Sequence, residues 1–566
     1  MRRTLILPFE VPDPVDRLAR LMGIRLLTRQ RITGADLARY AGGGASPWIA
    51  AHEVLKQALD GLYQDLSHGQ PTRLGKTYGI APDRIAHRLV QQVNISFGFH
   101  VLFLLTAQHH FGGDLILPAP AAFRRRLGQA GMSCHPLLSA MAWGWLRLRL
   151  QATGLLAHFV HCIHACRDEF RPDRLPEWAR SVKIAVWPAT DPGAFSSTPD
   201  RLSMGDFFKT GAILPFQECA ALLVSDADGA PPPPLVKTRH ILSARRSQGR
   251  NFRSLAAALT AHLPVVTALL GGQWQYVVLA RETALLPRAR LFANDVRPTW
   301  LVGGLPNIAS PNLWYELARQ FGAKLYIVCN SAQVTSIHQK GEMLPGHVPH
   351  IYMHPVADRF GAWTETHARA LSRFGIPRAA IDVAGPLIYS ARPPRRSLAL
   401  PGRKIMVDYF DQVPYRPSPI ESSGVPSLYW SPDRLIRTVE NIITALDQTL
   451  PAGSFCLRIK SKKVLPHLDA GYFQALEALA AQNPALRLVE WRTSALTLHS
   501  DSDLTISFPF ASPSISARWY GVPACYYDVD GLAAVDIMIV DDLPVLTTTE
   551  NLASWIAAQY SLLSRS

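Results

Sequence analysis

Cysteine is scarce in this sequence and follows no paired spacing. The 566 residues include 7 cysteines, an odd number, and no two of them form a Cys-x-x-Cys motif. A disulfide framework normally needs an even set, and a structural zinc site needs closely spaced pairs of ligands. The cysteine pattern therefore favours a reducing compartment, and we expect the protein to be cytoplasmic.

Charged residues are also few, at 18%, and they are unevenly distributed. Residues 402–566 contain 13 Lys and Arg against 17 Asp and Glu, whereas residues 1–401 contain 45 against 26. The basic front part predicts an anionic partner, which could be nucleic acid, an anionic membrane surface or a phosphorylated lipid. Because zinc-finger spacings, RNP-type motifs and long Lys/Arg runs are missing, we expect no nucleic acid.

Long uninterrupted apolar runs are missing as well. Near the start, "TLILPF" is broken by Pro8 and Glu10, which makes it too short for the core of a signal peptide. It is more typical of a first buried strand. Residues 127–166 contain only two charges, Arg147 and Arg149, but these arginines and several histidines interrupt every window long enough to span a bilayer.

Two interpretations of residues 127–166 stay open. The segment could be a buried pair of helices, or an amphipathic membrane element with Trp143 and Trp145 at the interface. The three arginines of "FRRRLG" (123–128) favour the membrane element, because they add positive charge beside it. His158, Cys162 and Cys166 share one helix face and could bind zinc, but packing is the more common role of such residues. We expect no metal.

Apolar runs that alternate with helical patterns predict an α/β fold with parallel sheets. The expected strands before residue 390 include "VKIAVWP", "QYVVLA", "RLFAND" and "KLYIVCN", and those after 402 include "RKIMVDYF", "SFCLRIK" and "LTISFPF". A Pro- and Arg-rich linker at 390–402 separates the two series. We therefore predict two Rossmann-like domains facing a cleft, at 1–395 and 402–566, with a helical apolar insertion around 90–170.

The stretch "TISFPFASPSISARWYGVPACYYD" (505–528) predicts a strand followed directly by a helix. We expect the strand to end at Phe510, Ser512 to cap the helix, Pro513 to follow at its first position and Ser514 to lie in its first turn. Free backbone N–H groups at such a helix start can bind a phosphate even without a glycine-rich loop. An ordinary capped helix is the alternative.

Further charged residues follow expected strands in the second domain. Lys460 and Lys462 lie just past "SFCLRIK", and Asp528 ends "ACYYD". Because ligands of α/β domains bind at the carboxyl ends of strands, the lysines are candidate phosphate ligands and Asp528 is a candidate ligand of a sugar or ribose hydroxyl. A solvated surface loop is the alternative for the lysines.

Candidate catalytic bases come from the first domain. Asp295 and His354 follow apolar runs, and Glu316 lies at the start of the helical pattern "SPNLWYELARQFG". A general base has to be an acid or a histidine within reach of an acceptor hydroxyl. Each of the three could equally serve as a helix cap or a turn residue, and the sequence does not choose among them.

At the stretch 505–528 the sequence resembles a known family. It is similar to the signature of bacterial polysaccharide-biosynthesis proteins named for a Pro-Phe-Thr-Ser motif, which here is Pro509-Phe510-Ala511-Ser512, with alanine in place of threonine. More broadly, residues 293–528 resemble glycosyltransferases of the GT-B fold. The resemblance covers about half of the chain.

The resemblance implies an active site between two domains, a nucleotide sugar bound mainly by the second domain, and no cofactor or metal. It implies that Lys460, Ser512 and Ser514 face the nucleotide phosphates, that Asp528 faces the sugar or ribose, and that the base comes from the first domain. It also implies that the last helix can cross back to the first domain.

We therefore expect a glycosyltransferase of surface polysaccharide or lipopolysaccharide biosynthesis. Its acceptor is expected to be a lipid-linked sugar or a glycan, and its location the inner face of the cytoplasmic membrane. Two alternatives stay open. A sugar-nucleotide epimerase has the same architecture but does not need an apolar insertion, and a non-catalytic assembly protein does not need Lys460 and Ser512.

Overall fold

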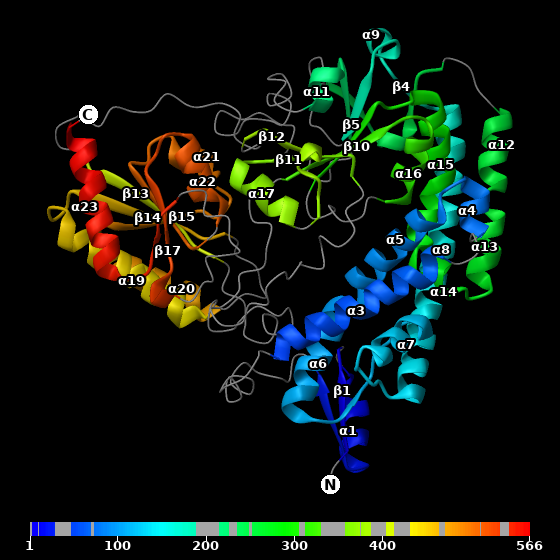
Figure 1. Cartoon of the computed structure of the whole chain (residues 1–566), viewed down its shortest axis with the longest axis horizontal. Helices are drawn as coiled ribbons and strands as arrows, with labels where there is room; N and C mark the ends of the chain where they lie inside the picture. Colours follow the sequence, from blue (N-terminus) through cyan, green and yellow to red (C-terminus); the bar gives the residue numbers. More distant parts are fainter. Residues whose placement is uncertain are drawn as a thin grey trace.

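Two large parallel β-sheets and a layer of long helices make up the computed structural model of the chain (Figure 1). The structure describes residues 3–8, 11–28, 47–68, 73–187, 214–225, 235–247, 252–304, 312–329, 357–373, 375–385, 403–412, 431–462, 470–509, 511–531 and 543–565. The linker predicted at 390–402 lies outside these residues.

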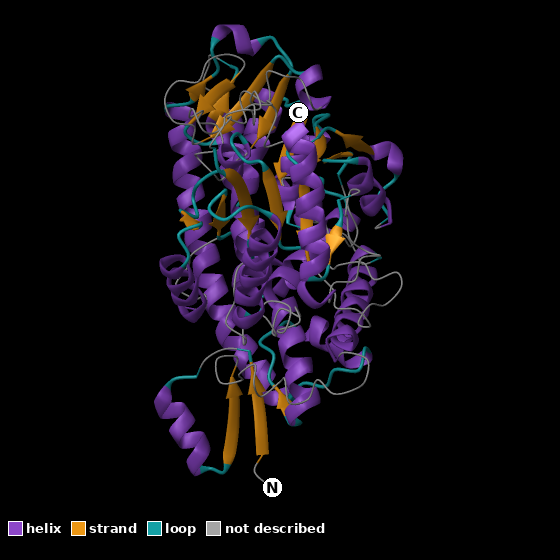
Figure 2. Cartoon of the chain, turned by 90° about the vertical axis from the view of Figure 1, so that its left-hand side faces the viewer, coloured by secondary structure: helices purple, strands orange, loops and turns teal. Residues whose placement is uncertain are grey.

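A small parallel sheet lies at one end of the molecule, beside the N-terminus (Figures 1 and 2). Its central strand is β1 (Arg3–Leu7), so the short apolar start of the chain is a buried strand as predicted. On either side lie β2 (Ile24–Thr28) and β3 (Asp114–Leu115). The helix α1 (Asp13–Leu21) connects the first two strands.

Helices from the first third of the chain share a hydrophobic core with this small sheet. They are α3 (Pro47–Ser67), α5 (Pro82–Val93), the π-helical turn η1 (Asn94–Gly98), α6 (Phe99–Phe111) and α7 (Ala121–Gln129). The short α4 (Arg73–Tyr78) precedes α5.

The first large sheet has seven parallel strands in the order β12-β11-β10-β9-β5-β6-β7. They are β5 (Ile184–Trp187), β6 (Ala221–Ser225), β7 (Leu235–Thr238), β9 (Trp300–Gly304), β10 (Lys324–Val328), β11 (Arg359–Ala362) and β12 (Ile381–Val383). The chain builds outward from β5 in one direction and then from β9 in the other. The strand order therefore reverses between β5 and β9.

Several helices accompany this sheet in the sequence. They are α9 (Glu177–Arg180), α11 (Leu214–Glu218), α12 (Phe252–Thr260), α13 (Leu263–Leu270), α14 (Trp274–Val278), α15 (Ala280–Val296), α16 (Leu313–Gln320) and α17 (Glu365–Arg373). The strands predicted from "QYVVLA" and "RLFAND" are wrong, because both runs are helical, in α14–α15 and at the end of α15. Alanine, leucine, arginine and glutamate favour a helix in α15, and short apolar runs do not distinguish helix from strand.

The second large sheet has six parallel strands in the order β15-β14-β13-β16-β17-β18. They are β13 (Ile405–Phe410), β14 (Phe455–Lys460), β15 (Leu486–Val489), β16 (Leu504–Ser507), β17 (Ala524–Tyr527) and β18 (Val545–Leu546). The strand order reverses between β13 and β16. The predicted α/β class with two Rossmann-like parallel sheets is therefore confirmed.

In the described part of the chain, five α-helices belong to this second sheet. They are α19 (Pro432–Thr449), α20 (Ala470–Gln482), α21 (Ala495–His499), α22 (Ser512–Trp519) and α23 (Thr549–Arg565). The last of them, α23, packs along α19 (Figure 1). The last helix thus stays with the second sheet, and the expectation that it crosses back to the first domain is not met.

The segment expected to be an apolar insertion contains one long helix, α8 (Pro136–Phe170), which packs along α15. The two helices approach closely at Gly154, where an added Cβ would lie 2.4 Å from the Cβ of Ala280. A buried ion pair also joins them, since the Nε of Arg288 donates to Asp168 over 2.9 Å. One side of α8 is therefore fixed against the core.

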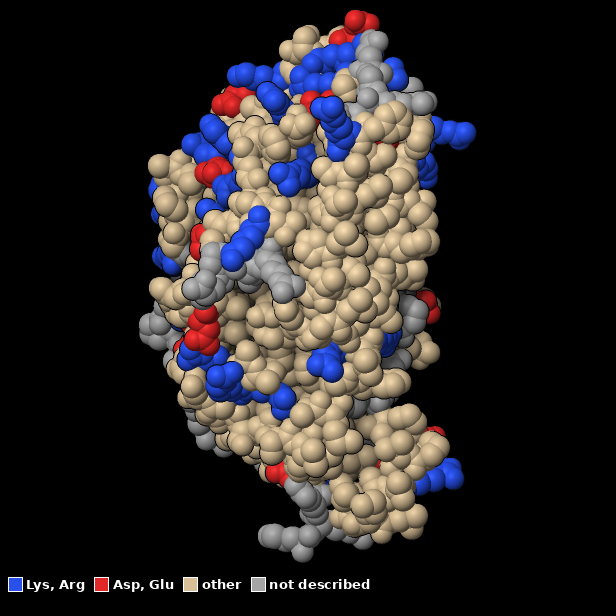
Figure 3. All heavy atoms as spheres, turned by 90° about the vertical axis from the view of Figure 1, so that its right-hand side faces the viewer, with Lys and Arg blue, Asp and Glu red and all other residues tan. Residues whose placement is uncertain are grey.

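The other side of α8 carries a stripe of exposed apolar side chains. Trp145 is 76% exposed, whereas Trp143 is buried and packs edge-to-face against Phe97. Only one of the two tryptophans expected at an interface therefore faces outward. The exposed members of the stripe are Leu137, Met141, Trp145, Leu148, Leu156, Phe159, Ile163 and Phe170. Figure 3 shows a broad face with few charges on the side where α8, α12 and α13 lie.

One described stretch in this region, Phe252–Leu270, has the length and composition of a membrane-crossing helix. Its mean hydropathy is 1.4, and 33% of it is buried. A second candidate is the pair Pro82–Gly98 and His100–His109, bent by 47° at the break between them. A core helix of a soluble protein meets the same criteria.

The end of the first sheet region approaches the second sheet at Gly385. This glycine has φ +83°, and an added Cβ would lie 2.8 Å from the ring of Trp519 in α22. A side chain at position 385 is therefore disfavoured both by the backbone conformation and by the ring. Close packing at Gly385 brings the first sheet region against the helix of the 505–528 stretch.

Candidate functional site

The carboxyl edge of the six-stranded sheet is the candidate site. The register pairs Phe410 with both Lys460 and Ser507, and Ser507 with Tyr526. Four strands thus end at nearly the same level, although they are far apart in the sequence. Because the strand order reverses between β13 and β16, a crevice is expected at this edge, where open α/β sheets bind their ligands.

Asp411 organises the ends of β13 and β14. Its carboxylate accepts hydrogen bonds from the Ser461 hydroxyl at 2.9 Å, the Tyr472 hydroxyl at 2.5 Å and the backbone N–H of Lys462 at 3.1 Å. Burial raises the pKa of Asp411 to about 6, although these hydrogen bonds and the nearby Lys460 oppose the shift. The fully enclosed carboxyl group fixes the backbone from which the two candidate lysines project.

The structure places Lys460 and Lys462 at this edge, as predicted. The Lys460 ammonium donates to the backbone oxygen of Trp491 over 3.0 Å, and burial lowers its pKa. Lys462 is exposed, and its ammonium lies 3.3 Å from the side-chain oxygen of Gln412. Both lysines therefore lie at the carboxyl end of β14. The Lys460 ammonium is on the side of Trp491, which follows β15, and the Lys462 ammonium is beside Gln412, which follows β13. Arg458, two residues before Lys460, instead pairs with the buried Asp408 inside the sheet.

The helix α22 begins at the predicted place but with a different cap. Its N-cap is Ala511, no side chain caps it, and Ser512 is the first helical residue. The prediction that Ser512 caps the helix is therefore wrong. The alanine at the third position of the Pro-Phe-Thr-Ser motif occupies the cap, where its side chain has no oxygen to accept a hydrogen bond from the N–H groups of the first turn.

The first-turn serine Ser514 faces the sheet. It is fully buried, and its hydroxyl donates to the backbone oxygen of Cys525 over 2.9 Å. Ser516, two residues further along, donates to the backbone oxygen of Pro513 and lies 3.0 Å from the imidazole of His499. These hydroxyls hold α22 in place. The expected role of Ser514 beside a phosphate is therefore not supported by the direction of its hydroxyl.

Asp528 lies at the end of β17 and is buried in an ion pair. Its carboxylate accepts from the guanidinium of Arg434 at 2.6 Å, and both side chains are almost fully enclosed. The same guanidinium lies over the ring of Phe508, 5.6 Å from its centre, and donates to the backbone oxygen of Val529. Arg434 therefore ties α19 to the ends of β16 and β17.

The two predicted catalytic residues that the structure describes, Asp295 and Glu316, have separate hydrogen-bond and ion-pair partners. Asp295 lies near the end of α15, not at a strand end, and accepts from the backbone N–H groups of Arg246 and Ser247. Glu316 lies in the first turn of α16, 3.6 Å from Arg319, and burial raises its pKa. His354 lies outside the described residues. Asp295 thus stabilises a local turn, and Glu316 lies next to an arginine that also pairs with Asp358.

The possible zinc ligands on α8 are His158, Cys162 and Cys166, and the structure shows other partners for His158. His158 is buried, with its Nδ1 2.8 Å from the Nδ1 of His262 and its Nε2 3.3 Å from the Thr283 hydroxyl. Burial lowers its pKa to about 3. Among the described residues, no group of three or more His, Cys, Asp or Glu side chains is arranged to hold a metal ion. His158 therefore packs α8 against its neighbours.

Sequence reasoning missed three residues at this site. Arg434 lies 94 residues before its partner Asp528, so no local pattern connects them. Asp411 and Gln412 directly follow the predicted strand "RKIMVDYF", and that position was a usable signal. Polar residues just past a parallel strand mark the edge at which ligands bind.

A family model for polysaccharide biosynthesis PFTS motif proteins matches residues 254–556. The chain belongs to this family. The match includes the whole six-stranded sheet and Pro509-Phe510-Ala511-Ser512 at the start of α22. None of the curated proteins matches the chain.

The chain is also similar to solved structures, at low identity. One is the lipopolysaccharide outer core galactosyltransferase WaaB in its apo form, at 11% identity and a TM-score of 0.35, covering 67% of this chain and 90% of that one. Another is the wall teichoic acid polymerase TagF, at 12% identity and 0.35, covering 73% and 90%. A third is the catalytic domain of starch synthase IV from Arabidopsis thaliana, at 10% identity and 0.35, covering 68% and 92%.

The buried carboxyl of Asp411 predicts a pH dependence of stability. Its folded pKa of about 6 lies above the usual value near 4, so the folded state binds more protons between these values and the free energy of unfolding falls as pH rises from about 4 to about 6. In Asp411→Asn this fall becomes shallower by up to about 1.4 kcal/mol per pH unit. Urea unfolding of the native protein and of Asp411→Asn at several pH values measures this change. If the free energy of unfolding changed equally with pH in both proteins, the raised pKa of Asp411 would be contradicted.

Proposed function

We propose that the protein is a glycosyltransferase that moves a sugar from a nucleotide-activated donor to a lipid-linked or polysaccharide acceptor. The observation that carries this proposal is the carboxyl edge of the six-stranded sheet, where Lys460 and Lys462 lie at the end of β14 and α22 begins shortly after β16. Membership of a polysaccharide-biosynthesis family supports the same class of reaction.

The donor diphosphate lies, in this proposal, at the carboxyl edge of the six-stranded sheet. Two ammonium groups and the backbone N–H groups at the start of α22 supply positive potential there. These groups can offset the charge of a diphosphate leaving group, so we propose a metal-independent, GT-B type transfer. Because Asp528 is neutralised by Arg434, its part is to position β17 and not to bind a sugar hydroxyl.

A membrane-facing side is the second part of the proposal. The exposed stripe of α8 lies on a face with few charges (Figure 3). Arg125 is an exposed cation in α7, which precedes α8 in the chain. Its neighbours Arg124 and Arg126 are engaged, by the backbone oxygen of Ala119 and by Asp65 respectively. We propose that this face rests on an anionic membrane, on the inner side of the cytoplasmic membrane.

Lys460→Gln tests the donor site. Loss of a charged hydrogen-bond donor is expected to weaken nucleotide-sugar binding by about tenfold or more. The matched control is Lys404→Gln, because Lys404 is an exposed lysine at the opposite, amino end of the same sheet. Calorimetric titration with the donor measures both variants. Equal affinities in Lys460→Gln and Lys404→Gln would refute the placement of the diphosphate.

Vesicle flotation tests the membrane-facing side. Binding is expected to require anionic lipid and to weaken with salt, since part of the attraction is electrostatic. Trp145→Gln combined with Phe159→Gln is expected to reduce binding by about tenfold or more, because each removes exposed apolar area that a membrane would bury. If vesicle binding depended neither on anionic lipid nor on these two substitutions, this face would be excluded as the membrane-binding surface.

The products of the reaction distinguish a glycosyltransferase from an epimerase. A transferase releases the nucleoside diphosphate and adds the sugar to an acceptor, whereas an epimerase returns a nucleotide sugar of altered configuration. Chromatography of the products after incubation with a membrane extract distinguishes the two. Conversion of the nucleotide sugar without release of nucleotide would favour the epimerase.

A further inference from the structure

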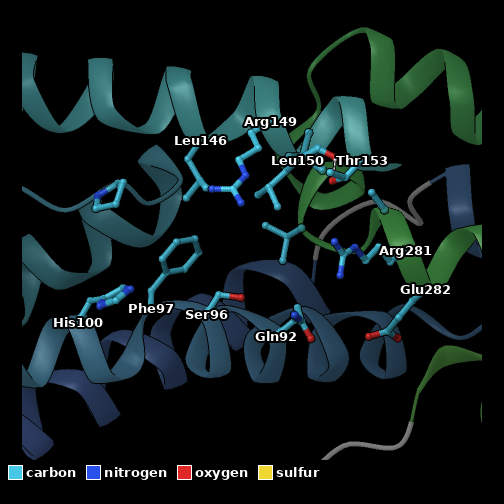
Figure 4. Close-up of a pocket in the computed structure, with 14 residues that line it drawn as sticks. Gln92, Ser96, Phe97, His100, Leu146, Arg149, Leu150, Thr153, Arg281 and Glu282 are labelled. Carbon is cyan, nitrogen blue, oxygen red and sulfur yellow. Dashed lines mark hydrogen bonds between the residues drawn. The ribbon is translucent and has the colours of Figure 1, made fainter. Parts of the chain in front are cut away.

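A cavity of about 550 Å³ lies among the helices of the front part, outside both large sheets (Figure 4). Its walls come from α5, η1 and α6 on one side, from α8 on another and from α14 and the start of α15 on a third. It is thus built from stretches that are far apart in the sequence. None of the residues predicted for the donor site lines it.

Two arginines give the cavity a positive charge. Arg149 of α8 and Arg281 of α15 both extend toward it (Figure 4). Among the described residues, neither guanidinium has a hydrogen-bond or ion-pair partner. The acid on the wall, Glu282, is already engaged, because its carboxylate accepts from the Nε of Arg88 at 2.8 and 3.0 Å. The cavity therefore has two cations and no uncompensated lining acid.

The remaining wall is mostly apolar. Phe97 is buried and is fixed by the edge-to-face contact with Trp143. Leu146, Leu150 and Val277 add aliphatic surface beside it. A ligand that fits this wall has a hydrocarbon part as well as a negative charge.

The cavity adjoins the exposed apolar stripe of α8. Arg149 follows Trp145 by four residues, so the two side chains are neighbours on one side of the helix. Trp145 is 76% exposed, and Leu148, next to Arg149 in the chain, is also exposed. An amphiphile that approaches along the stripe meets Arg149 at the border between the stripe and the cavity.

We propose that this cavity binds a lipid phosphate, with the phosphate between Arg149 and Arg281 and the first carbons of the chain against Phe97 and Leu150. Paired guanidinium groups are suited to a phosphate, and the adjoining wall shields hydrocarbon from water. Naming this lipid as the acceptor rests on the proposed function. Binding of the lipid phosphate does not, because the cavity is separate from the sheet edge.

The test compares farnesyl phosphate, inorganic phosphate and farnesol as probes of the full chain by calorimetric titration. Farnesyl phosphate is expected to bind at least tenfold more tightly than either inorganic phosphate or farnesol. If inorganic phosphate bound as tightly as farnesyl phosphate, the proposed contact of the hydrocarbon chain with the cavity would be overturned. If farnesol bound as tightly as farnesyl phosphate, the proposed contact of the phosphate with the two arginines would be overturned.

Variants locate the site. Arg149→Gln and Arg281→Gln are each expected to weaken farnesyl phosphate binding about tenfold, whereas Arg167→Gln, an exposed arginine near the far end of the same helix, leaves it unchanged. Ser96→Phe, which places a ring in the cavity, is expected to abolish binding. Unchanged affinity in the Arg149→Gln/Arg281→Gln double variant would overturn the proposal. Nucleotide-sugar binding is retained in all of them, so failure here is distinguishable from failure of the donor site.

Discussion

Parallel pairing of β13 with both β14 and β16 is the constraint on which the candidate site depends. It brings the ends of strands far apart in the sequence to one level, and the reversal of strand order between β13 and β16 leaves an edge open to a ligand. The hydrogen bonds of Asp411 then fix the backbone at Lys462. Without this pairing, the two lysines at the end of β14 and the start of α22 after β16 would not lie at the same edge of the sheet.

Buried ion pairs stabilise the arrangement around that edge. Arg458 and Asp408 join β14 to β13 inside the sheet, and Arg434 and Asp528 join α19 to the end of β17. Breaking one member of such a pair leaves the other charge buried without compensation, which costs several kcal/mol. These charges therefore position the strands and α19. Among the described residues at the edge, Lys460 and Lys462 are the cations that we propose to meet a ligand.

The sequence predicted the parallel sheets because apolar runs alternate with helical patterns, and it predicted the lysines because they follow a strand. It could not predict the direction of the Ser514 hydroxyl, which depends on how α22 is rotated against β17. The sequence also could not predict the ion pair between Arg434 and Asp528, because a contact between residues 94 positions apart leaves no local pattern. Asp295 was misplaced because a short apolar run suits a strand and a helix equally.

The front part of the molecule combines a charge-poor face with a positively charged cavity (Figures 3 and 4), and the rear part has the edge of a doubly wound sheet. A nucleotide-sugar site at that edge is the central claim. Thermal-shift measurements with UDP-, GDP-, CMP- and dTDP-sugars test it most directly, because a ligand that binds the folded state raises Tm. The account predicts a rise in Tm with at least one of them, and the absence of any shift across the set at millimolar concentration would contradict it.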